Sequence, residues 1–194
     1  MSTLLETTEA YVTHLLTEDL DPRFLYHNLE HTQRVVQSTK ELMDHYDLTG
    51  MEKKVLLLAA WLHDTGYTRG REGHEKESSR IASKFLLEQG LDQETTEQVC
   101  GLIMATERYH NPVNLLEEII RDADASHLGQ NIFMDVSELL KKELAQMEIA
   151  DYTPEEWRLL NLEIFRSEHH FYTDYARNHW QPGKDRNLQS LLKN

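Results

Sequence analysis

Histidine and aspartate residues gather in four segments of the sequence, at positions where helices are expected to begin or end. The segments are YHNLEH, AAWLHDTG, GHEKES and IIRDADASH. Imidazole and carboxylate groups bind divalent cations, and an imidazole can also transfer protons near neutral pH. These residue types predict a mixed nitrogen and oxygen metal site rather than a structural thiolate zinc site.

His63 and Asp64 directly follow the apolar segment VLLLAAWL. A buried carboxylate is costly unless it is paired or bound to a cation, so a metal ion would stabilise Asp64 and use the neutral imidazole of His63. In isolation the pair has a second interpretation, in which the helix emerges into water and DTG is its C-cap. Because metal ligands must converge from several elements, His31 and the acids of RDAD strengthen the metal interpretation.

Apolar residues recur at helical spacing along nearly the whole chain, without alternating strand patterns or internal repeats. We expect a loop and a short terminal helix at the C-terminal end, QPGKDRNLQSLLKN. The sequence thus predicts an all-α protein with one compact helical domain over residues 1–194. The other expected helices span residues 29–46, 52–63, 74–89, from Asp92 to before Pro112, about 113–127, and onward from Thr153.

The composition limits the classes of partner. The formal net charge of −14 repels nucleic acid, so nucleic acid is not expected to bind, whereas a small phosphorylated ligand can be held through a metal ion. The N-terminal sequence lacks the pattern of a signal peptide, and the longest apolar run, residues 55–62, is too short to cross a bilayer. With a lone Cys100, these features predict a cytoplasmic protein without a membrane segment.

The ordered motifs YHNLEH, AAWLHDTGY and IIRDADASHLG resemble those of the HD-domain superfamily of metal-dependent phosphohydrolases, over residues 24–130. A single HD dipeptide is common, but the ordered set H…HD…D in helical contexts is specific. The resemblance implies an all-α HD domain, with the helices of residues 131–194 packing on its core. It also implies four metal ligands, which are His31, His63, Asp64 and one aspartate of the DAD step.

Two aspartates compete for the last ligand position. Family members commonly have an alanine before the ligand aspartate, and this pattern falls on Ala123-Asp124. Asp122 lies two residues earlier and would point away on a helix. Asp124 is therefore the expected ligand, with Asp122 as the alternative.

The opening motif YHNLEH is similar to that of class I cyclic-nucleotide phosphodiesterases, which share the HD core. The similarity implies that His27 donates a proton to the leaving oxygen while His31 binds metal. Residues four apart on a helix would place the two imidazoles about 6 Å apart. The alternative is that His27 and Asn28 cap the helix. Because the similarity ends after HDTG, it does not imply a cyclic-nucleotide substrate.

Further residues complete the expected site. His74 and Glu75 resemble a catalytic His-Glu element of bacterial HD hydrolases, and His74 and His110 are candidates for a second metal. The alternative is that both histidines face solvent at helix ends. Basic side chains that could bind a phosphate, or else carry ordinary loop charge, are Arg69, Arg71, Lys76 and Lys184.

The function that the resemblance implies is hydrolysis of a phosphoester or phosphoanhydride in a small substrate, expected to be a nucleotide, by metal-activated water. His27 or His74 would protonate the leaving oxygen. The expected cofactor is a divalent ion, of Mn, Fe, Co, Ni, Mg or Zn. One alternative is an HD-type di-iron oxygenase, which would need both His74 and His110 as ligands. Another is a non-catalytic nucleotide-sensing or partner-binding module. The sequence leaves the substrate, the number of ions and the oligomeric state open.

Overall fold

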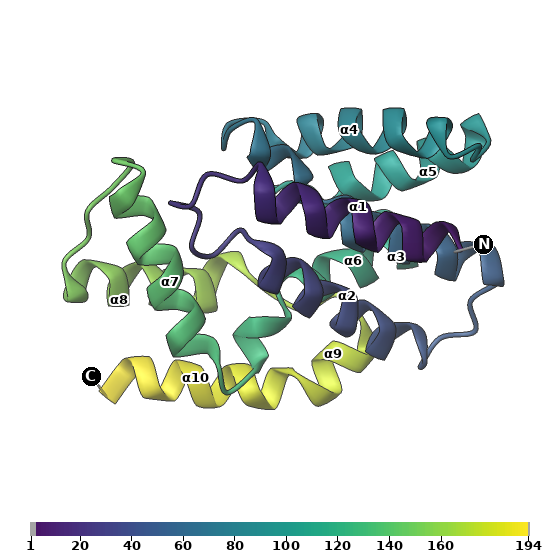
Figure 1. Ribbon diagram of the computed structural model, residues 1–194. Coiled ribbons are helices and arrows are strands. Elements are labelled where there is room, and N and C mark those ends of the chain that lie inside the picture. Colours follow the sequence, from purple (N-terminus) through teal and green to yellow (C-terminus); the bar gives the residue numbers. More distant parts are fainter. Residues whose placement is uncertain (1–2, 194) are drawn as a thin grey trace. The chain divides into compact units, whose positions relative to one another are not determined.

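A computed structural model describes residues 3–193 of the chain (Figure 1). This part contains ten α-helices, two 3₁₀ helices, one π-helix and no strand, which confirms the all-α prediction. It separates into two compact units. The first unit combines the residues up to Asp21 with His27–Asp124, and the second combines Pro22–Tyr26 with the residues from Ala125 onward. The single domain and the packing of residues 131–194 on its core stay predictions.

The first unit is built around one central helix, α3, which packs on α1, α2, α5 and α6. Its buried residues occupy nearly every side, as the apolar sequence VLLLAAWL predicts. Helices α4 and α5 lie side by side (Figure 1). The elements of this unit are α1 (Leu4–Glu18), α2 (Leu29–Met43), α3 (Gly50–Leu62), η1 (Thr65–Thr68), α4 (His74–Glu88), α5 (Gln93–Met104) and α6 (Leu115–Asp124).

Side-chain caps fix where the helices begin. Asn28 is the N-cap of α2, and its Oδ1 accepts a hydrogen bond from the backbone N–H of His31 at 3.1 Å. His27 therefore lies just outside the helix and His31 in its first turn. Asp92 caps α5 by accepting from the backbone N–H of Thr95 at 2.9 Å, as the sequence predicts.

The second unit has its own hydrophobic core, formed by Leu128, Phe133, Leu162, Phe165 and Leu191. Its elements are η2 (Ser126–Gly129), α7 (Phe133–Gln146), α8 (Pro154–Glu163), the π-helix η3 (Ile164–Glu168), α9 (Asp174–His179) and α10 (Gln181–Lys193). The short segment before His27 belongs to this unit: the backbone N–H of Tyr26 donates to the buried carboxylate of Glu143 at 2.8 Å.

The C-terminal sequence forms a longer helix than predicted. The expected loop and short terminal helix are wrong, because α10 begins at Gln181 and runs to Lys193. Pro182 lies in the first turn, where its missing N–H costs no helical hydrogen bond. Gly183 is needed for close packing, since a Cβ atom there would overlap the carbonyl oxygen of Gly129. Both residues thus serve the start of a helix, although their types are typical of a loop.

Two further findings concern the helix boundaries and lengths. The helix expected over about residues 113–127 is shorter, because α6 ends at Asp124 and the chain tightens into η2. Within residues 3–193, no helix combines the length and apolar character that a bilayer span requires.

Candidate metal centre

Three helices of the first unit bring the predicted ligands together. His31 lies in the first turn of α2, His63 is the C-cap of α3, and Asp124 is the last residue of α6. Asp64 follows His63 directly and precedes η1. Because α2 packs on both α3 and α6, helix margins that are far apart in the sequence meet at one place.

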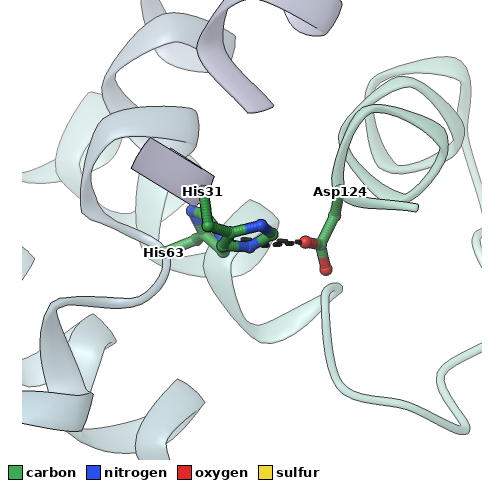
Figure 2. A group of neighbouring side chains, drawn as sticks. All are labelled: His31, His63 and Asp124. Atoms are coloured by element: carbon green, nitrogen blue, oxygen red, sulfur yellow. Dashed lines mark hydrogen bonds and ion pairs between the residues drawn. The ribbon is translucent and has the colours of Figure 1, made fainter. Parts of the chain in front are cut away.

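The imidazoles of His31 and His63 and the carboxylate of Asp124 point toward one another (Figure 2). The Nε2 atoms of the two histidines are 3.3 Å apart. Asp124 Oδ1 lies 3.1 Å from His31 Nε2 and 3.7 Å from His63 Nε2. Asp64 Oδ2 lies 3.2 Å and 3.3 Å from the same two nitrogens. Two nitrogen and two oxygen atoms therefore converge, as the mixed donor set requires.

These separations fit a bound cation. Metal–ligand bonds of about 2.0–2.2 Å at tetrahedral or octahedral angles place neighbouring ligand atoms roughly 2.8–3.6 Å apart. Within residues 3–193, one group of three or more potential ligands has all its ligand atoms within 4.8 Å of one another, and it consists of His31, His63 and Asp124. Asp64 adds a buried carboxylate oxygen, Oδ2, that accepts no hydrogen bond from the described residues. A cation would satisfy this oxygen.

The backbone of α3 orients His63. Its Nδ1 donates to the carbonyl oxygen of Ala60 at 2.9 Å, so the neutral imidazole presents an unprotonated Nε2 to the other ligand atoms. Such a second hydrogen bond commonly fixes the tautomer of a metal-binding histidine. The sequence gives no signal for this contact, because every residue carries a carbonyl group.

The electrostatics of the cluster are those of tightly coupled opposite charges. Burial opposes the charged form of His63, but Asp64 and Asp124 outweigh it and raise the pKa of His63 to about 9. Burial likewise opposes charge on His31, yet the same two carboxylates raise its pKa. Burial also opposes ionisation of Asp64, but the charge of His63 and contact with His31 hold its pKa well below the ordinary value. The carboxylates are thus ionised and ready to bind a cation.

The two aspartates of the DAD step take different positions. Asp124 faces the imidazoles and keeps 31% of its side chain exposed, whereas Asp122 is completely buried within α6. Asp124 is thus the acid that meets His31, and the ligand role assigned to it stays a prediction.

The comparison with protein families agrees with this arrangement. The HD domain matches residues 28–129, which is more than half of the chain and includes all four converging residues. The chain belongs to the HD domain family. No curated protein and no solved structure matched it. HD domains bind divalent metals and are generally hydrolases, and the cluster in this HD domain is a possible metal site.

Beside the four converging residues, an aromatic side chain contacts the two histidines predicted to be catalytic. Tyr67 stacks on His27 with ring centroids 4.2 Å apart and on His74 with centroids 4.1 Å apart. His74 Nε2 lies 3.7 Å from Asp64 Oδ1, and His74 Nδ1 lies 3.4 Å from Glu75 Oε2. His74 and Glu75 thus border the cluster. Sequence reasoning missed Tyr67, although an aromatic residue three positions after Asp64 was visible.

Other predicted site residues lie elsewhere. His110 is on the segment between α5 and α6, where its Nε2 pairs with Glu117 Oε2 at 2.8 Å. The group of converging ligands found among residues 3–193 contains neither His74 nor His110, and the second metal stays a prediction.

The basic residues divide into two sets. Arg69, Arg71 and Lys76 are exposed between the end of η1 and the first turn of α4. Lys184 belongs to the second unit and is 3% exposed, with its Nζ donating to the His169 carbonyl at 2.5 Å. The predicted phosphate-binding role of all four residues stays a prediction.

Proposed function

We propose that this HD domain is a metal-dependent phosphohydrolase that cleaves a phosphoester or phosphoanhydride bond of a small phosphorylated substrate, a nucleotide. The observation that carries the proposal is the convergence of His31, His63, Asp64 and Asp124, from three helices, in a chain of the HD family. No thiolate takes part, which suits a hydrolytic centre more than a structural zinc site.

The four converging residues would hold the ion. His31 and His63 would bind through Nε2, and Asp64 and Asp124 through the oxygens that face these nitrogens. The carboxylates offset two positive charges, and the Ala60 carbonyl keeps the His63 imidazole in the required tautomer. When bound, a divalent ion supplies an activated water and charge neutralisation at the phosphoryl group.

His27 is the proposed proton donor to the leaving oxygen. Its ring centroid lies 6.1 Å from that of His31 and 6.4 Å from that of His74. His27 lies outside α2, and its ring is next to that of His31, a proposed metal ligand. It can therefore face a substrate that lies between its imidazole and the ion. His74 is closer to the carboxylates, with 3.7 Å between its Nε2 and Asp64 Oδ1. This proximity suits His74 to orienting water rather than to meeting the leaving group.

Arg69, Arg71 and Lys76 are proposed to attract and bind the phosphate groups. All three are exposed on the short stretch that leaves the metal centre through η1 and enters α4. In a chain with a formal net charge of −14, cations beside the centre give an anionic substrate a favourable approach.

A panel of nucleotides tests the proposal. Nucleoside triphosphates, monophosphates and cyclic nucleotides are incubated with the full chain and Mn, Mg, Co, Ni or Zn, and product release is measured. We expect turnover with at least one metal, and a loss of about 100-fold or more in Asp64→Ala. Asp47→Ala, which removes an exposed carboxylate of the same unit, is the control and should retain activity. Equal product release by the wild type and Asp64→Ala would refute the mechanism.

A further inference from the structure

The rings of His27, Tyr67 and His74 form an aromatic stack beside the proposed metal centre. Tyr67 is 4% exposed and stacks on both histidines, at interplanar angles of 19° with His27 and 28° with His74. The two histidines are partly exposed. The buried tyrosine ring is therefore the shared support of two side chains that reach the surface of the site.

Contacts between Gly66 and α4 fix the backbone next to Tyr67. The N–H of Gly66 donates to Ser78 Oγ on α4 at 2.8 Å. A Cβ atom at Gly66 would overlap the backbone oxygen of His74, so η1 and the first turn of α4 approach each other as closely as their backbones allow. Tyr67 and His74 thus have fixed relative positions.

His27 lies just outside α2. It precedes Asn28, the N-cap of α2, so the helical ladder does not hold it. The stacking with Tyr67, whose ring centroid lies 4.2 Å from that of His27, supplies a flat surface that favours one orientation of the imidazole.

We infer that Tyr67 is a positioning residue: its ring holds the imidazole of His27 in the orientation for proton donation, and holds His74 at the edge of the metal centre. This inference rests on the proposed hydrolytic function. Tyr67 acts through the two histidines, because its buried ring offers almost no surface to a substrate.

Two model substrates separate this role from a general structural one. Phenyl phosphate has a poor leaving group that needs a proton, whereas p-nitrophenyl phosphate has a good leaving group that needs little protonation. With the Mn²⁺-loaded full chain, we expect Tyr67→Leu to lower kcat about 10-fold for phenyl phosphate. For p-nitrophenyl phosphate we expect kcat to fall by less than about 2-fold. The metal content should be unchanged. Tyr67→Phe keeps the ring and should resemble the wild type for both substrates.

The matched control is Tyr11→Leu, which removes another stacked tyrosine of the same unit, 4.1 Å from Phe85. It should leave the ratio of the two rates unchanged. An equal change for both substrates in Tyr67→Leu, or no change, would overturn the inference while leaving the hydrolytic function in place. If the leucine variant does not fold, Tyr67→Met makes the same comparison.

A spectroscopic measurement keeps the inference testable even if the wild type hydrolyses neither compound, an outcome that would count against the proposed function. In the Zn²⁺-loaded chain, stacking should shift the ring-proton NMR signals of His27 and His74 upfield through the ring current of Tyr67. His27→Gln and His74→Gln assign the signals. The shifts should persist in Tyr67→Phe and disappear in Tyr67→Leu or Tyr67→Met. Absence of the shifts in the wild type would show that Tyr67 does not position these rings.

Discussion

His31 Nε2 and His63 Nε2 lie 3.3 Å apart, and both face the carboxylates of Asp64 and Asp124. Two protonated imidazoles at this distance would repel each other, so the carboxylates must compensate for the charge in the metal-free protein. A single divalent ion would replace these protons with two positive charges shared by all four groups. Protons and a metal ion would therefore compete for the same atoms.

This competition predicts proton release when metal binds. His63 has a pKa of about 9 in the metal-free protein and His31 a raised pKa, but both must be neutral to bind an ion. Calorimetry with Mn²⁺ at pH 7.5, in buffers of different ionisation enthalpy, should show release of about one proton or more per ion. The apparent affinity should increase with pH up to about 9. Binding without proton release at pH 7.5 would contradict the protonated cluster.

The raised pKa of His63 also determines how the stability of the metal-free protein changes with pH. Since the folded-state pKa of His63 is raised from 6.5 to about 9, its contribution to stability is fully present below pH 6.5. This contribution is lost as the pH rises through about 9. Asp64 has a lowered pKa, so its contribution is present above pH 3.8 and is lost as the pH falls below that value.

The two histidines of YHNLEH should respond differently to substitution. His31→Ala removes a converging nitrogen and should weaken metal binding roughly 100-fold. His27→Ala leaves the four converging groups intact. It should therefore keep the metal content while lowering kcat for phenyl phosphate about 100-fold or more, the usual contribution of a positioned proton donor. Metal analysis and kcat are measured on the same preparations.

His14→Ala, a substitution in α1, is a control for the general effect of losing a histidine and should change neither quantity. Loss of metal from His27→Ala would place both histidines of the motif among the ligands and would remove the proton-donor assignment.

Local signals could predict where His31 and His63 lie on their helices, whereas Asp64 and Asp124 were expected in the ligand set because of the resemblance to HD domains. The long apolar run ends at His63, and the N-cap Asn28 sets the start of α2, which leaves His31 in its first turn. The contacts of Tyr67 and the Ala60 carbonyl depend on how η1, α3 and α4 pack, and no local pattern reports this packing. Local periodicity also could not reveal that Asp122 is completely buried.

The all-α fold was predictable from helical spacing and caps, but the C-terminal helix was not. Proline and glycine at residues 182 and 183 indicate a loop when local preference alone is considered. In the structure, the first residues of a helix tolerate Pro182, and packing against Gly129 requires Gly183 to lack a side chain. Tertiary packing thus overrides the local signal at this end of the chain.

The aspartates of the DAD step should separate metal binding from stability. Asp124→Asn removes a charge that faces His31 and should weaken metal binding more than it changes the stability of the metal-free protein, where the imidazoles can lose protons to compensate. Asp122→Asn changes a completely buried group and should lower the free energy of unfolding by about 1–3 kcal/mol, with metal binding largely retained. Metal titration and urea unfolding of both variants measure the two effects. The reverse pattern would make Asp122 the ligand.

Lys184 should give the second unit a distinct dependence of stability on pH. Burial lowers the pKa of its amine from 10.5 to about 8, although its Nζ donates to the His169 carbonyl and lies 5.6 Å from the ring centroid of Phe165. Between pH 8 and 10.5 the unfolded chain therefore binds more protons at this residue than the folded chain does. The free energy of unfolding contributed by Lys184 should rise with pH across that window, by up to about 3 kcal/mol.

Lys184→Met keeps a long side chain in the same place without the amine. We expect the stability of the wild type, relative to this variant, to increase between pH 8 and 10, as measured by urea unfolding at several pH values. The difference between the two free energies of unfolding cancels the contributions from ionisation of tyrosines and other lysines, because both proteins contain these residues. The exposed Lys193, at the end of the same helix, supplies the control Lys193→Met, whose difference from the wild type should stay constant. A constant difference for Lys184→Met would mean that its amine keeps an ordinary pKa in the folded protein.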